Sequence, residues 1–190
     1  MNTVSTVKNI DTNTIPSPVN LPLINIASHN VRSFNNPAKQ NYLMSLYKSH
    51  DLDIIGLQET DFLFNSSSIF NRSFSKFTSF FSTNQESQAS GFGVSLSFSK
   101  KLAKHVFFHE SKFDRLIYAK LQFADKQKLL VVNAYLPPYK PDSKAICKSV
   151  QSYVCSFLSE ATRDDYHIIL LGDFNANFDR IQNHNIQSNL

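Results

Sequence analysis

Residues 167–175 read HIILLGDFN, an apolar run that ends abruptly in a glycine and two polar side chains. Four consecutive aliphatic residues bounded by a turn residue predict a buried strand that ends at Gly172. Asp173 and Asn175 then follow at the carboxyl end of that strand. Residues 53–60, DIIGLQET, repeat the arrangement, with Glu59 just beyond a second apolar run. In open α/β sheets, binding sites form at the carboxyl ends of strands. These two stretches therefore indicate both the fold class and the place where a site would lie.

Further strands and two helices alternate with these runs along the chain. Asn36 and Pro37 suit the start of a helix, whose apolar stripe we expect to be Tyr42, Leu43, Leu46 and Tyr47. The other elements that the patterns predict are buried strands at 21–28, 129–135 and 167–171, half-buried strands at 94–98 and 117–123, and a helix at 142–160. Alternating strands and helices predict an α/β fold, and the short connections within 112–135 predict some antiparallel pairing, hence a mixed sheet.

Composition places the chain among ordinary globular proteins. Its 190 residues are 42% hydrophobic and 18% charged, which excludes collagen, a coiled coil and a wholly disordered chain. There are 17 Phe and no Trp, so aromatic burial must rest on Phe. No apolar run approaches the roughly 20 residues that span a bilayer, and residues 1–20 lack the apolar core of a signal peptide. We expect a disordered lead-in at 1–20, a domain at 21–180 and a polar tail at 181–190.

The same features predict an intracellular monomer that is neither secreted nor bound to a membrane, with the nucleus as a candidate compartment. The net charge is +4, and residues 100–128 hold eight Lys or Arg against three acidic residues. This basic stretch fits either a solvated strand face guarded by lysines or a track for a phosphate backbone. Cys147 and Cys155 match neither a zinc spacing nor a disulfide framework, so we expect two buried free thiols.

Polar residues end several of the predicted strands, and burying them unpaired would be costly. Carboxylates and amides gathered at one edge would suit Mg²⁺, which prefers oxygen ligands. Each residue also has a simpler interpretation: a solvent carboxylate for Glu59, an Asx turn for Asp173, a turn residue for Asn30, packing for Tyr135 and a surface charge for Arg115. Their combination on successive strand ends favours a site.

The series of motifs resembles the endonuclease/exonuclease/phosphatase superfamily, and within it the apurinic/apyrimidinic-endonuclease-like domain of non-LTR retrotransposons. The motifs are NIASHNVRSF (25–34), DIIGLQET (53–60), GFGVSLSF (91–98), DRLIYAKL (114–121), VVNAYLPP (131–138) and IILLGDFNA (168–176). The resemblance covers about residues 21–180. It implies two mixed β-sheets packed as a sandwich flanked by helices, and Mg²⁺-dependent cleavage of phosphodiesters, with Mn²⁺ as a substitute and DNA as the partner.

The resemblance also implies a role for each strand-end residue. Asn30 and Glu59 match the residues that hold the metal. Asp173 matches the carboxylate that orients and activates the attacking water, and Asn175 matches its supporting amide. Tyr135 matches the phenol beside the scissile phosphate. Arg115 matches a strand arginine, which we expect to contact phosphate or nucleic acid.

Two further functions compete with a retroelement-derived DNA endonuclease. In the family, another strand and a Ser-Asp-His segment follow GDFN, whereas this sequence stops at Leu190. The resemblance therefore implies a C-terminal truncation that leaves the second half of the fold incomplete. One alternative is an inactive truncated remnant or passive nucleic-acid binder. The other is a phosphatase of small phosphate esters or phosphoinositides.

Overall fold

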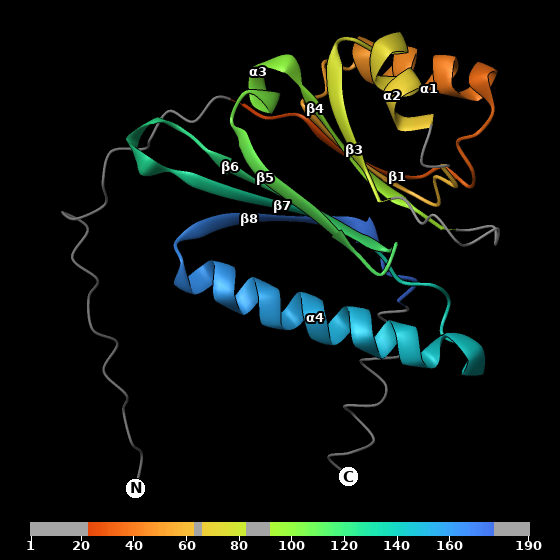
Figure 1. Cartoon of the computed structure of the whole chain (residues 1–190), viewed down its shortest axis with the longest axis vertical. Helices are drawn as coiled ribbons and strands as arrows, with labels where there is room; N and C mark the ends of the chain where they lie inside the picture. Colours follow the sequence, from red (N-terminus) through yellow and green to blue (C-terminus); the bar gives the residue numbers. More distant parts are fainter. Residues whose placement is uncertain (1–22, 63–65, 83–91, 177–190) are drawn as a thin grey trace, which may run out of the picture.

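The computed structural model describes residues 23–62, 66–82 and 92–176, which form eight strands and four α-helices (Figure 1). The elements of the first half are β1 (Ile26–Asn30), α1 (Pro37–Ser49), β2 (Ile54–Gln58), α2 (Ser66–Ser73), β3 (Phe77–Phe81) and β4 (Val94–Ser99). Those of the second half are α3 (Lys100–Ala103), β5 (Val106–Lys112), β6 (Leu116–Gln122), β7 (Lys128–Tyr135), α4 (Lys144–Arg163) and β8 (Tyr166–Asp173). Short 3₁₀ turns lie at Ala124–Lys126 and Pro141–Ser143.

The strands form two mixed four-stranded sheets. The first has the order β1-β2-β4-β3, with β1 and β2 parallel and the other pairs antiparallel. The second has the order β5-β6-β7-β8, with β7 and β8 parallel and the other pairs antiparallel. Figure 1 shows α1 and α2 outside the first sheet and α4 along the outside of the second. The predicted α/β sandwich of two mixed sheets flanked by helices is confirmed.

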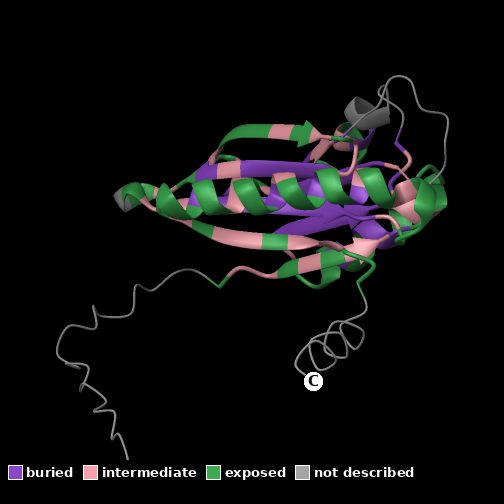
Figure 2. Cartoon of the chain, turned by 90° about the horizontal axis from the view of Figure 1, so that it is seen from below, coloured by how far each residue is buried: buried purple, intermediate pink, exposed green. Residues whose placement is uncertain are grey.

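Three apolar layers hold the sandwich together. The layer between the sheets contains Ile54, Val94, Leu96, Phe98, Ile117, Ala119, Leu121 and Val131. A second layer lies between the first sheet and helices α1 and α2, and a third lies between the second sheet and α4. Figure 2 shows the buried residues concentrated in the strands, with exposed residues along the outer side of α4. Removing this apolar surface from water is the main stabilising term.

Helix α1 begins where the sequence predicts, but a different face is buried. The Asn36 side chain accepts hydrogen bonds from the backbone N–H of Ala38 and Lys39, as a capping residue does. The buried residues are Leu43, Met44 and Tyr47, whereas Tyr42 is 67% exposed and Leu46 38% exposed. The predicted stripe was therefore wrong in two of its four positions, because the line of contact with the sheet passes through Met44.

Three other expectations are also corrected. Strand β4 is buried on both faces, including Ser95 and Ser97, because α1 and α2 cover the face that the serines were expected to expose to solvent. Strand β8 was expected to be buried, but it lies at the edge of its sheet and Leu170 is 40% exposed. Cys147 is buried as expected, whereas Cys155 faces solvent on α4; both thiols are free.

Two buried amides join the sheets. Gln58 Nε2 donates to Asn133 Oδ1 at 2.6 Å, and Asn133 Nδ2 donates to the backbone oxygens of Leu57 and Ser95 at 2.8 Å each. These side chains are buried polar groups that satisfy one another and the backbone. A side chain at Gly56 would meet Asn133, since an added Cβ would lie 3.0 Å from Asn133 Cγ. The network fixes how β2 of one sheet faces β7 of the other.

Two of the predicted segments cannot be compared with the structure. The lead-in at 1–20 and the polar tail at 181–190 lie outside the described residues. Among the helices of the described ranges, none combines the length and the apolar character needed to cross a bilayer.

Candidate active site

The carboxyl ends of four strands meet at one end of the sandwich and bring the predicted polar residues together. β1 and β2 run in parallel in one sheet, and β7 and β8 run in parallel in the other, with Tyr135 paired to Asp173. β1 lies against β8 across the two sheets. The sandwich therefore places Asn30, Glu59, Tyr135 and Asp173 within one region, although they are up to 143 positions apart in sequence.

Asn30 is the centre of this group. Its Nδ2 donates to Glu59 Oε1 at 2.8 Å and to Asp173 Oδ2 at 2.9 Å. Because both carboxylate oxygens bond to the same nitrogen, they are at most 5.7 Å apart. The other amide atom, Oδ1, accepts from the backbone N–H of Arg32 at 3.1 Å. Two negative charges thus face one neutral amide, an arrangement that leaves them open to compensation by a cation.

The backbone at Glu59 is strained and firmly held. Its φ of +54° lies in the left-handed region, which residues other than glycine adopt at a cost. Hydrogen bonds hold both sides of the turn: Ser33 N donates to Glu59 O at 2.7 Å, and Thr60 N donates to Gly93 O at 3.1 Å. The surrounding structure therefore directs the Glu59 side chain towards Asn30.

Gly172 positions Asp173 at the end of β8. Its φ is +152°, and an added Cβ would lie 2.1 Å from the carbonyl oxygen of Ala134. Any side chain there would push β8 away from β7 at the residue before Asp173. The glycine of the GDFN motif therefore allows the close approach of the two strands that carry Tyr135 and Asp173.

Tyr135 is a buried phenol bonded to Glu59. Burial, together with the hydrogen bond to the Glu59 carboxylate, raises the pKa of the Tyr135 hydroxyl well above its usual value. The phenol therefore stays protonated at neutral pH and can donate a hydrogen bond. It reaches the same carboxylate as Asn30 does, from the opposite sheet.

Arg115 lies beside this phenol, in the turn immediately before β6. Its guanidinium carbon is 5.2 Å from the centre of the Tyr135 ring and 4.7 Å from the centre of the Phe92 ring. The backbone N–H of Tyr135 donates to Arg115 O at 2.7 Å. Burial lowers the pKa of the guanidinium, which nevertheless remains a cation. Sequence reasoning missed Phe92, and the only indication was an aromatic residue between two glycines in GFG.

Asn175 follows Asp173 and holds its backbone turn. The Asn175 N–H donates to Asp173 Oδ1 at 3.1 Å, and its side-chain Nδ2 donates to the backbone oxygen of Leu136 at 2.8 Å. The residue has a φ of +45°, in the left-handed region that asparagine tolerates. The side-chain nitrogen of Asn175 therefore bonds to the backbone just after β7, and its backbone N–H orients the Asp173 carboxylate.

The donor set fits a hard divalent cation. The described residues contain no group of three His, Cys, Asp or Glu side chains placed to share an ion, so the site depends on two carboxylates and one amide. Mg²⁺ is commonly bound by only one or two carboxylates and keeps several waters. Rotating the Asn30 amide by 180° would exchange its nitrogen for an oxygen between Glu59 and Asp173 and would give up the hydrogen bond from the Arg32 N–H. All three side chains could then offer oxygen to one ion.

A cavity of about 400 Å³ opens next to these residues. It is lined by Ser28, Asn30, Gln58, Gly172, Asp173, Phe174, Asn175 and Ala176. Asn30 and Asp173 thus line an open pocket that a bound molecule could enter.

The basic stretch does not form one track across the site. Lys101 pairs with Asp53 at 2.8 Å, at the start of β2, which lies roughly 20 Å along the strand from Glu59. Lys112 pairs with Glu110, and Lys128 donates to the backbone oxygen of Asp164. Of the predicted phosphate contacts, Arg115 is the one at the strand ends that carry the carboxylates.

The profile of the endonuclease/exonuclease/phosphatase family matches residues 27–190. The chain therefore belongs to this family. A search of curated protein sequences found no significant match.

Solved structures share the fold at low sequence identity. D. rerio TDP2 in complex with a single-strand DNA product is 21% identical, with a TM-score of 0.62 over 84% of this chain and 64% of that one. AP endonuclease LMAP from Leishmania major is 15% identical, with a TM-score of 0.61 over 77% and 53%. A family protein from Bacteroides thetaiotaomicron is 14% identical, with a TM-score of 0.57 over 80% and 63%. The chain spans less than two thirds of each of these structures.

Proposed function

We propose that the chain is a divalent-metal-dependent phosphodiesterase that cleaves a nucleic-acid strand at the site formed by Asn30, Glu59 and Asp173. One observation carries the proposal: the Asn30 amide joins two carboxylates from opposite sheets at 2.8 and 2.9 Å. Enzymes of this family generally depend on a divalent metal. A bound Mg²⁺ or Mn²⁺ would neutralise charge on the phosphate and on the departing oxygen.

The other residues have roles that follow from their contacts. Asp173 accepts the proton of the attacking water, with one carboxylate oxygen oriented by the backbone N–H of Asn175. Tyr135 donates a hydrogen bond to the anionic transition state, because its raised pKa keeps it protonated. Arg115, held between two rings, supplies a positive charge for a neighbouring phosphate.

DNA is the substrate that the neighbouring structures favour. The D. rerio TDP2 structure holds a single-strand DNA product, and another structure of similar fold is an AP endonuclease. The more specific proposal, a DNA endonuclease of retroelement type, rests on the resemblance of the six motifs. It predicts that an intact supercoiled plasmid is nicked without needing an abasic site.

Nicking of supercoiled plasmid tests the proposal. We expect the chain to convert supercoiled into open-circular DNA with Mg²⁺ or Mn²⁺ and to stop when EDTA is added. Asp173→Asn should reduce the rate by about 100-fold or more, since it removes the proton acceptor. Glu160→Gln is the matched control, because it also replaces a carboxylate by an amide, on the exposed side of α4. It should nick like wild type.

Three results would contradict the proposal. Equal nicking by wild type and Asp173→Asn would point to a contaminating nuclease. Release of inorganic phosphate from small esters or phosphoinositides, without nicking, would favour a phosphatase. DNA binding without turnover of any of these substrates would favour a passive binder.

A further inference from the structure

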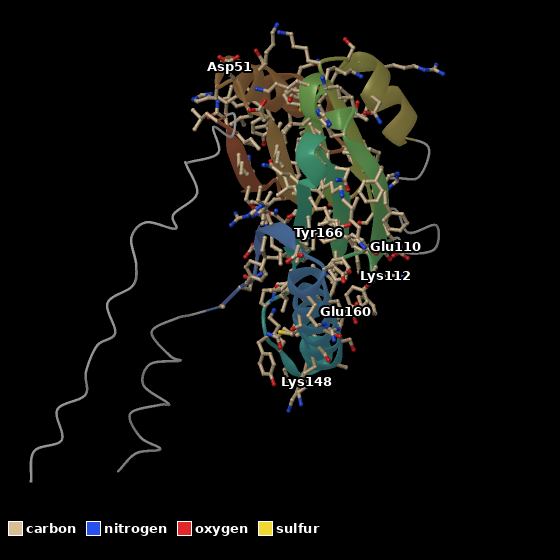
Figure 3. The ribbon with its side chains drawn as sticks, turned by 90° about the vertical axis from the view of Figure 1, so that its left-hand side faces the viewer. Asp51, Glu110, Lys112, Lys148, Glu160 and Tyr166 are labelled. Carbon is tan, nitrogen blue, oxygen red and sulfur yellow. The ribbon has the colours of Figure 1, made fainter. Side chains whose placement is uncertain are left out.

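A second cavity, shallow and wide open to solvent, lies between the β5–β6 turn and helix α4, with a volume of about 550 Å³. Its lining combines two aromatic side chains, one lysine and several serines: Phe113, Lys148, Ser149, Ser152, Tyr153 and Ser156. None of these residues belongs to the site described above. In Figure 3, Lys148 projects from one end of α4.

Phe113 is displayed by its turn rather than buried in the core. Phe113 and Asp114 have φ values of +58° and +51°, as the two central residues of a type I′ hairpin turn do. The Phe113 ring is 44% exposed and meets the Tyr153 ring edge-on, with centroids 5.8 Å apart. The hairpin geometry accounts for this backbone, since Arg115 N donates to Lys112 O at 3.2 Å across a two-residue turn of the kind that joins twisted antiparallel strands. The turn leaves a large apolar side chain half in water beside Tyr153, where a planar ligand could stack on it.

Tyr153 is held in place by contacts on its other sides. Its ring is nearly parallel to that of Phe157, at 17° with centroids 5.9 Å apart. Its hydroxyl bonds to Tyr118, whose own hydroxyl donates to Glu110 at 2.5 Å. Glu110 is also paired with Lys112, so its negative charge is largely compensated. Figure 3 shows Glu110 and Lys112 side by side. The aromatic wall of the cavity is therefore rigid.

The cavity continues the line of the candidate active site. Asp173 pairs with Tyr135, Tyr135 N donates to Arg115 O, and Phe113 is two residues before Arg115. Neighbouring strands are about 5 Å apart, so the path from Asp173 to the β5–β6 turn runs across the ends of β8, β7 and β6 in the second sheet. Along it come the carboxylate of Asp173, the phenol of Tyr135, whose ring packs between the sheets, and the guanidinium of Arg115. The rings of Phe113 and Tyr153 then follow on the α4 side of the second sheet. A strand with its phosphate at Asp173 would have positive charge at Arg115 and Lys148 and an aromatic face at Phe113.

We propose that this cavity binds an unpaired base of the nucleic-acid strand whose phosphodiester lies at the candidate active site. This inference rests on the proposed function and adds the kind of strand that the site selects. Bases stack on exposed aromatic side chains regardless of sequence, and nearby cations track the backbone. A base paired within a duplex has both faces covered, so the subsite selects single-stranded or unwound segments.

Binding of a fluorescein-labelled deoxyoligonucleotide in EDTA tests the subsite without cleavage. Phe113→Ala should weaken binding of the single strand by about fivefold to a hundredfold and leave a blunt duplex of the same sequence nearly unaffected. Phe107→Ala removes another exposed ring of the same hairpin, 57% exposed and away from the cavity, and should bind like wild type. Equal binding by wild type and Phe113→Ala would overturn the proposal, as would an equal loss for single strand and duplex.

A fluorescent variant gives a direct measure of stacking. The chain contains no Trp, so Phe113→Trp introduces its only indole. Adding the single strand should quench this fluorescence, and Phe113→Trp should retain wild-type affinity. The same addition to Phe107→Trp should change little. Unquenched Phe113→Trp at saturating oligonucleotide would also overturn the proposal.

The binding and nicking experiments fail separately. If single-strand binding depends on Phe113 but the chain never nicks DNA, the subsite proposal is supported and the proposed hydrolysis is contradicted. Nicking that depends on Asp173, with single-strand binding indifferent to Phe113, would sustain the hydrolysis and remove the subsite.

Discussion

Asn30 has an unusual position among the site residues because one amide nitrogen donates to two carboxylates. Glu59 and Asp173 would repel each other if nothing lay between them, since like charges at this separation are destabilising. The amide dipole relieves part of that repulsion, and a divalent cation would relieve much more. We therefore expect the site to bind a divalent ion even in the absence of substrate.

Tyr135→Phe isolates the phenol from the ring that packs against Arg115. The variant keeps the ring under the guanidinium and removes only the hydroxyl that bonds to Glu59. We expect kcat for nicking to fall by about 100-fold with little change in KM, as for loss of one transition-state donor. Because the pKa of this phenol is raised, the ratio of wild-type to variant rates should stay constant up to about pH 10. A rise in KM alone would instead assign Tyr135 to binding.

At the residue scale, the sequence predicts side-chain types better than their hydrogen bonds. The sequence indicates that Asn30, Glu59 and Asp173 lie at strand ends, because each comes at the end of an apolar run, and the structure brings them together. Nothing in the sequence indicates that the Asn175 amide nitrogen donates to Leu136 O, because that contact exists only once β7 and β8 pair. Phe92 and Phe113 were missed for the same reason: their neighbours, Arg115 and Tyr153, come from other elements.

At the scale of elements, β2 is fixed at both ends by charged side chains. Glu59 ends it at the site, and Asp53 begins it at the other end of the sheet. Asp53 accepts hydrogen bonds from Asn25 N at 3.2 Å, from Ser99 Oγ at 3.1 Å and from Lys101 Nζ at 2.8 Å. These contacts join β2 to β1, to the end of β4 and to α3.

Asp53→Asn should destabilise the chain in a pH-dependent way. Burial would raise the pKa of Asp53, but the bonds from Lys101, Asn25 and Ser99 outweigh it and lower the pKa below its ordinary 3.8. The stabilisation is therefore complete above the unfolded-state pKa and is lost as the pH falls through the lower folded-state value. The difference in free energy of unfolding between wild type and variant should be large at neutral pH and narrow below about pH 4.

Urea unfolding at a series of pH values measures this difference. Asp51→Asn, two residues earlier and exposed, is the matched control and should follow wild type throughout. If the difference in free energy of unfolding between wild type and Asp53→Asn stays constant down to the acid transition, the Asp53 charge does not contribute to stability.

The elements themselves were largely predictable, but their buried faces were not. Apolar runs and the Asn36-Pro37 start predicted β2, β7, α1 and most of α4. Which side of α1 is buried depends on how the helix crosses the sheet, so Met44 replaced Tyr42 in the core. Likewise, β4 was expected to have one solvent face because its serines alternate with apolar residues, and the helices that cover it belong to distant segments.

At the scale of the whole molecule, the sequence pattern predicted a mixed sheet, and the sandwich of two such sheets came from the resemblance. The strand order β1-β2-β4-β3 joins segments whose pairing no local pattern specifies. The buried pair Gln58 and Asn133, which joins the two sheets, shows why the order matters: it fixes β2 opposite β7 and thereby Glu59 opposite Tyr135. The basic stretch, contiguous in sequence, is divided between both ends of this sandwich.

The central claim is that distant strand ends share one divalent ion, and Mn²⁺ binding followed by electron paramagnetic resonance tests it most directly. We predict one Mn²⁺ per chain, displaced by Mg²⁺, with affinity reduced by tenfold or more in Glu59→Gln and in Asp173→Asn, and unchanged in Glu160→Gln. Mn²⁺ bound with wild-type affinity by the double variant Glu59→Gln, Asp173→Asn would contradict the account.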